Sequence, residues 1–413
     1  MSRLIRFALG AGFVVGAPCL TLAAASAAPF VPTDDAQILE TGLPSADPRM
    51  RQMRSLAGQL ATDPSSQQLA MNLAARQLAM GVAEADPRFV GYARGTLARW
   101  WSDEPASPAL RIMRARILQA QHDFAGATAQ LREVLHDEPE NPGALLLLAS
   151  VAEATGEFDT AKDSCARFGR IRPGLTAAAC RASVDSQTGE SDASFTALSD
   201  AIAHMPTTDS AQLLWALTIL GEIAVRRDDP RATDYLKQAL ALDPRNVYAL
   251  TVYADYLLDH AGAAIVLRLL RGFERIDALY LRLVLAEQIT GDPGFRNDRA
   301  DLASRFVAAQ QQGDVLHLRD ASRFTLEIEH DSRHALDFAQ QNWTTHKSPY
   351  DAYVFLAAAI ACHDAPAAQP VIDWAARNHL EDKKIERQLQ QVEALPKDRL
   401  AGQPVGTAPS LPK

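Results

Sequence analysis

The sequence is poor in aromatic residues, in lysine and in cysteine, and its charge balance is acidic. Aromatic residues make up 7% of the 413 positions, and lysine accounts for only 7 of the 41 basic residues. Acidic residues outnumber basic ones by 50 to 41, for a formal net charge of -9. A protein that binds nucleic acid through its phosphates needs a basic face. This balance therefore argues against a nucleic-acid partner.

Long apolar runs are also missing beyond Ala27. A membrane-spanning helix needs about 20 mainly apolar residues, so we expect no transmembrane anchor in the mature chain. The composition is otherwise that of a folded protein, with 47% hydrophobic and 22% charged residues. At 413 residues the chain exceeds the roughly 100–200 typical of one domain. We therefore expect several domains or an elongated array.

The segment from Met1 to Ala27 has the pattern of a secretory signal. Arg3 and Arg6 precede an uncharged apolar run over residues 7–24, and small residues follow up to Ala27. The alternative is an uncleaved anchor helix, but the run is short and is interrupted by Pro18 and several glycines. We expect cleavage near Ala27. With the excess of arginine over lysine, this predicts an exported bacterial protein that is periplasmic or secreted.

Two further segments differ from the rest of the chain. Residues 28–48 contain four prolines and little helical period, which predicts an extended leader. Residues 396–413 are rich in proline, glycine and serine, which predicts a disordered tail. The folded region then spans residues 49–395, where no stretch shows the alternation that is typical of β-strands.

This region repeats itself with a period of about 34 residues. Four pairs of identical residues share that spacing: Ala115 and Ala149, Phe124 and Phe158, Ala127 and Ala161, and Pro139 and Pro173. Each unit contains two amphipathic segments joined by a polar turn. The alanines permit close approach of two antiparallel helices, and the proline ends the unit because it cannot continue a helix.

These residues resemble the tetratricopeptide repeat family, whose unit has a small residue in each helix, an aromatic residue before the second helix and a closing proline. The match is best over 108–141 and 142–173, and it recurs over 213–246, with Ala239 and Pro244, and over 247–275. The tryptophan that the family carries near the start of its first helix is absent. The resemblance implies an all-α fold: a right-handed α-solenoid of about eight helical hairpins. Weaker echoes extend it over 67–101, 176–204, 278–311, 321–342 and 351–378, with a capping helix near 381–393.

Two of the three cysteines that follow Ala27 are candidates for a disulfide. Cys165 and Cys180 fall on neighbouring helices of adjacent units, and an oxidising compartment permits a bond between them. The loop that it would close is short, so the bond would stabilise the fold by roughly 3 kcal/mol. The alternative is that both are small buried hydrophobic residues. Cys362 is interpreted as a core residue.

Histidines offer the only hint of a chemical site. His330 and His334 are four residues apart, and His363 repeats the place of His330 one unit later. The arrangement lacks the adjacent glutamate of a helical metalloprotease motif, so solvated or turn-capping histidines are the simpler interpretation. Nucleophile elbows, phosphate loops and paired Cys-x-x-Cys motifs are absent. We expect no metal, no cofactor and no catalysis.

The resemblance instead implies that the concave face of the solenoid binds a protein or peptide partner. Helical spacing predicts that six residues face inward: Arg116, Gln119, Ser150, Glu153, Asp255 and Asp259. The basic residues with which some family members hold a C-terminal carboxylate are missing here. A groove of this sign would favour neutral or basic segments. Two alternatives stay open: a metal-handling or enzymatic protein that uses the three histidines, and a purely structural spacer.

Overall fold

Helices make up the fold of the described part of the chain. The computed structural model describes residues 47–205, 209–311, 313 and 317–395, and within these it contains no β-strand. The chain divides into two units, Met1–Pro48 and Arg49–Lys413. Only Asp47 and Pro48 of the first unit are described, so the account below concerns the second. The predicted signal, nearly all of the leader and the predicted tail lie outside the described residues. Pro48, the last residue of the expected leader, already begins a helix.

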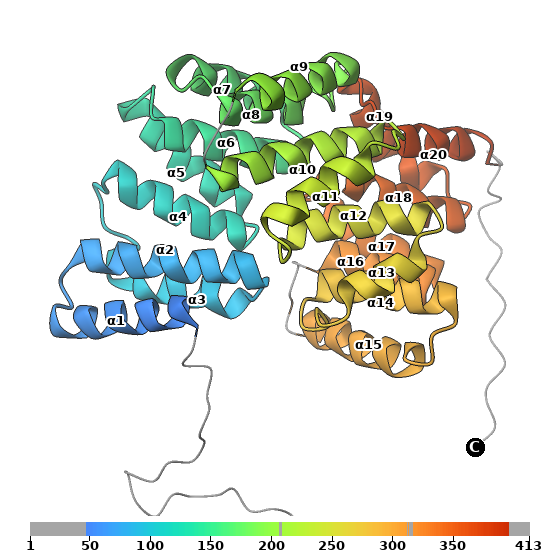
Figure 1. Cartoon of the computed structure of the whole chain (residues 1–413), viewed down its shortest axis with the longest axis horizontal. Helices are drawn as coiled ribbons and strands as arrows, with labels where there is room; N and C mark the ends of the chain where they lie inside the picture. The colour runs from blue at the N-terminus through green and yellow to red at the C-terminus, as the bar shows by residue number, and fades with distance from the viewer. Residues whose placement is uncertain (1–46, 206–208, 312, 314–316, 396–413) are drawn as a thin grey trace, which may run out of the picture. The chain divides into compact units, whose positions relative to one another are not determined.

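Nine helical hairpins follow one another along the described chain, one more than expected, with one helix before them and one after (Figure 1). The flanking helices are α1 (Pro48–Thr62) and α20 (Lys383–Glu393). The hairpins are α2 (Gln67–Glu84) with α3 (Pro87–Thr96), α4 (Pro108–Ala120) with α5 (Phe124–Asp137), α6 (Pro142–Ala154) with α7 (Phe158–Ile171), α8 (Leu175–Asp185) with α9 (Ser191–His204), α10 (Ser210–Arg226) with α11 (Ala232–Leu242), α12 (Val247–Asp259) with α13 (Ala263–Leu270), α14 (Asp277–Thr290) with α15 (Phe295–Gln311), α16 (Leu318–Glu327) with α17 (Ser332–Trp343), and α18 (Pro349–Ala361) with α19 (Gln369–Arg377). Short 3-10 turns cover Ala98–Trp100 and Pro366–Ala368.

The ends of these helices follow local sequence signals. The side chains of Ser107 and Asn141 accept hydrogen bonds from the first turns of α4 and α6, and a proline occupies the first helical position of each. A cap of this kind satisfies backbone donors that lack a partner within the helix. Pro139 and Pro173 fall between hairpins, and Pro244 does so further along the chain. These three prolines thus lie in the turns that separate one hairpin from the next.

Small residues allow the two helices of a hairpin to approach closely. The alanines of the repeat pattern are almost fully buried: Ala115, Ala127, Ala149, Ala161 and Ala239. Phe124 and Phe158, at the start of α5 and α7, are buried beside them. In α10 the small residue is Gly221, where an added Cβ would lie 2.7 Å from the side chain of Leu236. Each hairpin buries one apolar face within itself and the other against its neighbours.

The first helices of successive hairpins also contact one another, from α4 through α6, α8, α10, α12, α14 and α16 to α18. They thus form a continuous inner layer, while the second helices lie outside it. Cys165 of α7 and Cys180 of α8 form a disulfide that joins adjacent hairpins, with a Cα–Cα distance of 5.7 Å. Cys362 is half-buried, and its thiol donates a hydrogen bond to the carbonyl oxygen of Ser332 at 3.1 Å. The α-solenoid expected from the repeat pattern is confirmed.

The last hairpins fold back against the middle of the array. One hydrophobic cluster unites residues of α6, α7 and α8 with residues of α17 to α20, and Leu146 and Trp215 of the inner layer pack against it. The backbone N–H of Lys347 donates to the carbonyl of Ala154 at 3.0 Å. That of Ser191 donates to the Glu381 carboxylate at 2.7 Å. Figure 1 shows α19 and α20 beside α9 and α10. The array therefore closes on itself through contacts between residues about 190 positions apart.

None of the helices in the described part of the chain has the length and apolarity that a membrane span requires.

Candidate functional site

A row of polar side chains runs along the inner layer and links each first helix to the next. Gln119 of α4 donates to Ser150 of α6 at 2.9 Å. Five further bonds continue the row: Ser183 of α8 to Glu153 of α6 at 2.6 Å, Gln187 just after α8 to Glu153 at 2.5 Å, Arg226 of α10 to Ser186 at the C-cap of α8 at 2.7 Å, Tyr248 of α12 to Glu222 of α10, and Arg282 of α14 to Asp255 of α12 at 2.8 Å. We call this row the inner polar ladder. Apolar packing alone does not explain this row of polar contacts, because the apolar faces of each hairpin are already buried within the hairpin and against its neighbours.

Four residues at the middle of the ladder, which we call the central cluster, lie deep in the fold but contact solvent. They are Glu153, Glu222, Arg226 and Tyr248. The Tyr248 side chain is 57% exposed, yet the surrounding protein raises its pKa well above the ordinary value, as does the charge of Glu222. All four residues lie on first helices, α6, α10 and α12, so the central cluster belongs to the inner layer of the array.

The same surroundings disfavour the charged form of Glu222. Desolvation raises its pKa to about 7, and the negative charge of Glu153 adds to the rise. Arg226 and the hydrogen bond from Tyr248 oppose it. Desolvation also raises the pKa of Glu153, although Ser183 and Gln187 donate to its carboxylate. The central cluster thus carries carboxylates whose charge the protein compensates incompletely.

This pKa makes the stability of the fold depend on pH. Because the folded-state pKa of Glu222 exceeds its unfolded value, Glu222 contributes stability below about pH 4.5 that is lost as the pH rises to about 7. We expect the Glu222→Gln variant to lose less of its unfolding temperature than the native chain between pH 5 and pH 8. Thermal unfolding followed by circular dichroism across this range measures the difference. Parallel curves for the two proteins would contradict the assignment.

Further along the ladder, three arginines surround one tyrosine. The hydroxyl of Tyr350 accepts hydrogen bonds from Arg282 at 2.6 Å and from Arg323 at 2.7 Å, and the Arg319 guanidinium lies 4.8 Å from the ring centroid. Asp255 pairs with both Arg282 and Arg323. Burial alone would raise the pKa of Asp255, but these two arginines outweigh it and hold the pKa below the ordinary range. The charges here are mutually compensated, which indicates a structural role.

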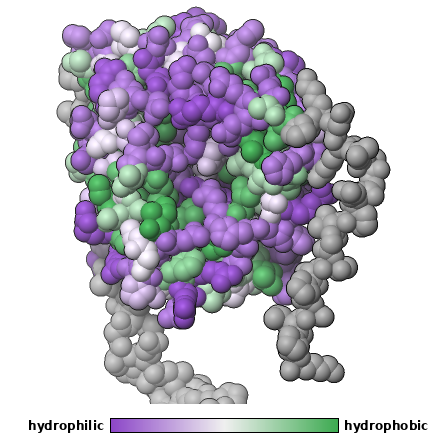
Figure 2. Space-filling model, turned by 90° about the vertical axis from the view of Figure 1, so that its right-hand side faces the viewer, coloured by the Kyte–Doolittle hydropathy of each residue, from purple (hydrophilic) through white to green (hydrophobic). Residues whose placement is uncertain are grey.

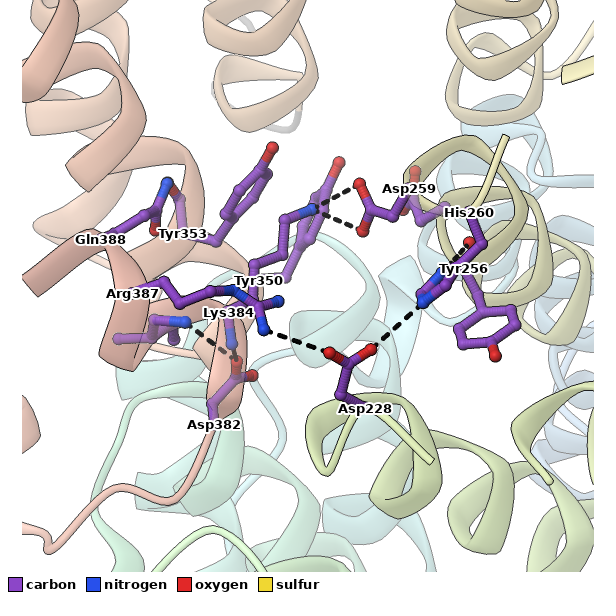
Figure 3. A network of polar contacts seen from close by, with 12 residues as sticks. Asp228, Tyr256, Asp259, His260, Tyr350, Tyr353, Asp382, Lys384, Arg387 and Gln388 are labelled. Atoms are coloured by element: carbon purple, nitrogen blue, oxygen red, sulfur yellow. Dashed lines mark hydrogen bonds and ion pairs between the residues drawn. The ribbon is translucent and has the colours of Figure 1, made fainter. Parts of the chain in front are cut away.

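Helix α20 lies beside this group and contacts the inner layer at Asp259 (Figure 3). Lys384 Nζ contacts both Asp259 oxygens, at 2.7 and 2.9 Å, and lies 3.6 Å from the ring centroid of Tyr353. Arg387 donates to Asp228 at 3.1 Å, and His260 contacts the other oxygen of the same carboxylate, also at 3.1 Å. The chain itself therefore covers the C-terminal end of α12, at Asp259, while Tyr248 at the start of the same helix stays exposed.

The structure places the six predicted groove residues in the inner layer, but in different environments. Arg116 and Ser150 are exposed, and Glu153 is half-buried. Asp255 and Asp259 are engaged by Arg282 and Lys384. Their role in binding stays a prediction.

Sequence reasoning missed Glu222, Arg226 and Tyr248. A signal existed, since Tyr248 precedes Asp255 by two helical turns on the same face. Glu222 and Arg226 are four residues apart in α10 and share a face in the same way.

The three histidines do not converge in the fold. His330 and His363 each adopt a positive φ, 58° and 52°, in the turn that joins two helices of a hairpin. His334 lies in the first turn of α17, where its Nδ1 contacts Asp331 at 2.6 Å and this bond raises its pKa. Within the described ranges, no group of three or more His, Cys, Asp or Glu residues could hold a metal ion. The regular spacing of His330 and His363 reflects a repeated turn.

On the face that Figure 2 shows, hydrophilic residues predominate and the hydrophobic patches are separate. Large exposed hydrophobic side chains are dispersed over several helices: Val82, Tyr92, Met205, Leu242, Tyr248, Ile265, Ile289 and Val307. Scattered exposed apolar residues are normal for a folded protein. The inner polar ladder and its central cluster are therefore the candidate site.

Comparison with known proteins gives one family match and several distant structural likenesses. Residues 118–174 match the family model described as tetratricopeptide repeat. No curated protein matches the chain. Among solved structures, the human IFIT1 dimer with PPP-AAAA is similar at 13% identity and a TM-score of 0.42, covering 80% of this chain and 95% of that one. Yeast Tom70 shares 12% identity at a TM-score of 0.38, with 84% of each chain covered. The P58(IPK) TPR domain shares 13% identity at a TM-score of 0.22, covering 78% and 98%.

Proposed function

We propose, from the premise that this chain is a tetratricopeptide repeat protein, that it is an interaction scaffold that binds a partner polypeptide on its concave side. The partner would lie along the part of the inner polar ladder between α4 and α12. The observation that carries the proposal is the exposure of polar side chains, from Arg116 and Ser150 to Tyr248, on a continuous layer of first helices. Side chains that packing does not require are available for recognition.

The charge of this surface supports a polypeptide rather than a nucleic acid as the partner. Glu153 and Glu222 contribute negative charge, and the whole chain has a formal charge of -9. Phosphate binding needs an excess of positive charge at the contact. A polypeptide with polar or basic side chains is compatible with the central cluster.

We also propose that the protein acts in an oxidising compartment, the bacterial periplasm. Two features support this: the Cys165–Cys180 disulfide and the signal pattern of residues 1–27. Disulfides persist in exported proteins and are rare in reducing cytosol. The scaffold would then hold its partner within the cell envelope.

Site-specific photocrosslinking tests the proposal. A photoreactive residue placed at Ser150, on the inner side of α6, should yield one adduct with a defined protein in intact cells of the source organism. The same residue at Arg116 should trap the same protein. The adduct should be recovered from the periplasmic fraction, and its mature N-terminus should be Ala28.

A photoreactive residue at Arg132, exposed on the outer helix α5, is the matched control. It should give the adduct in much lower yield, because the partner lies on the opposite side of the hairpin. Equal yields from Ser150 and Arg132, or no adduct from either inner position, would refute a concave binding site. Recovery of the adduct only from the cytosolic fraction would refute the proposed compartment alone.

A further inference from the structure

The chain contains its own example of how the concave side holds a cation. Lys384 Nζ lies 3.6 Å from the ring centroid of Tyr353 and contacts the Asp259 carboxylate at 2.7 Å. The ring face offers negative electrostatic potential and the carboxylate offers charge, so the two act together on one ammonium group. The Lys384 and Asp259 side chains are each about one-third exposed. The inner layer can therefore hold a lysine at a site that solvent reaches.

The central cluster has the same two components. Tyr248 and Glu222 provide a ring and a carboxylate, held together by the hydrogen bond from the Tyr248 hydroxyl to Glu222. Tyr248 is 57% exposed, so its ring is accessible from the concave side. Glu153 lies close enough for its charge to raise the pKa of both residues. A second carboxylate thus reinforces the first.

The central cluster differs from the Lys384 site in one respect. Among the described residues, no ion pair within 4 Å involves Glu153 or Glu222. Arg226 acts on both carboxylates through its charge, but its hydrogen bond goes to Ser186 at 2.7 Å. One guanidinium therefore faces two carboxylates without direct contact. The local charge is negative in surroundings that penalise it, and an incoming cation would relieve that penalty.

We propose that Tyr248, Glu222 and Glu153 form a subsite for a lysine or arginine side chain of the bound polypeptide. The ring of Tyr248 contacts the cation, Glu222 pairs with it and holds the ring by the hydroxyl, and Glu153 adds charge from the neighbouring hairpins. This inference rests on the proposed function and specifies the chemistry of the partner. It also fixes where the bound polypeptide lies along the inner layer, because its basic residue must reach α10 and α12.

Binding of a cation here is linked to the ionisation of Glu222. A cation favours the ionised carboxylate, so binding releases protons while Glu222 is partly protonated. With a pKa of about 7 for Glu222, the affinity for a cation rises between pH 6 and pH 8. In the Glu222→Gln variant this dependence is lost.

Calorimetric titration with hexalysine tests the subsite, using the full mature chain at constant ionic strength. We expect a three- to tenfold weaker Kd for Glu222→Gln and for Tyr248→Ala, the range for a lost ion pair or cation–π contact. In the double variant the Kd should rise by less than the product of the two single fold-changes, because both substitutions act on one ammonium group. Hexamers of Nε-acetyl-lysine, which lack the charge, should bind at least tenfold more weakly to the native chain.

Glu133→Gln is the matched control, since it makes the same charge change on the exposed outer side of α5. Its Kd should stay within twofold of the native value. An equal loss of hexalysine affinity in Glu133→Gln and Glu222→Gln would overturn the subsite, because hexalysine would then be binding to net charge alone. So would an unchanged Kd for Tyr248→Ala in a variant whose circular dichroism shows native folding. Crosslinking from Ser150 is read separately: if it persists, the scaffold function stands even where the cation subsite fails.

Discussion

Replacement of Arg282 by methionine should lower the free energy of unfolding by about 3–5 kcal/mol, the range for breaking a buried ion pair. Arg282 is fully buried and donates to Asp255, to Asp320 and to the Tyr350 hydroxyl. Methionine fills part of the volume but leaves two buried carboxylates with less compensation. Urea denaturation monitored by circular dichroism measures the loss. Asp255 and Asp320 belong to α12 and α16, so the variant should weaken three consecutive hairpins together.

Arg299→Met provides the control for an ion pair in solvent. Arg299 pairs with Glu329 at 2.6 Å, but its side chain is 47% exposed. An exposed pair of this kind contributes about 0–1 kcal/mol. Similar losses from Arg282→Met and Arg299→Met would show that the buried group does not hold the hairpins together. A free energy of unfolding for Arg282→Met equal to that of the native chain would also show that the buried group does not hold the hairpins together.

Gly156→Val should destabilise the chain by about 3–4 kcal/mol, the second-largest effect that we expect, from left-handed strain and overpacking together. Gly156 has a φ of 74°, and an added Cβ would lie 2.5 Å from Nε1 of Trp374 and 2.9 Å from Cβ of Lys347. These contacts belong to the closure between the middle of the array and its last hairpins. The variant should therefore loosen α17 to α20 first, which hydrogen exchange with mass spectrometry can detect by segment.

The Gly291→Val variant separates the effect of left-handed backbone strain from that of steric overlap with neighbouring residues. Gly291 has a similar φ of 70°, but an added Cβ would meet nothing within 4 Å. This variant should lose only about 1–2 kcal/mol, from the left-handed backbone conformation. Faster hydrogen exchange in α17 to α20 is expected for Gly156→Val and not for Gly291→Val. Equal losses and equal exchange in the two variants would mean that the tight contact at Trp374 does not secure the closure.

Local signals were sufficient to predict a fold of successive helical hairpins. Prolines such as Pro139 and Pro173 end a unit for a reason that acts within one helical turn, and capping residues such as Ser107 and Asn141 act equally locally. The burial of Ala115 and Phe124 follows from helical periodicity together with the sequence repeat. The Cys165–Cys180 pair was also accessible to this reasoning, because it joins helices that are adjacent in the chain.

The candidate site was predicted only in part, since its function depends on which inner residues stay accessible. Periodicity placed Asp255 and Glu153 on the same inner face. It could not show that Arg282 neutralises Asp255, while Glu153 and Glu222 form no ion pair within 4 Å among the described residues. That difference arises from neighbours on other hairpins. It changes Asp255 from a candidate contact for a partner into part of the core.

The sequence by itself determined the architecture: a series of repeated helical hairpins, their caps and their small contact residues. Each of these depends on residues that are close along the chain. Only the tertiary structure decided that the last hairpins fold back on the middle of the array, that Lys384 covers Asp259, and that Tyr248 remains accessible. The physical reason is that the closing contacts join segments far apart along the chain. The curvature of the array of hairpins determines which distant segments come into contact. A repeat pattern carries no information about that curvature.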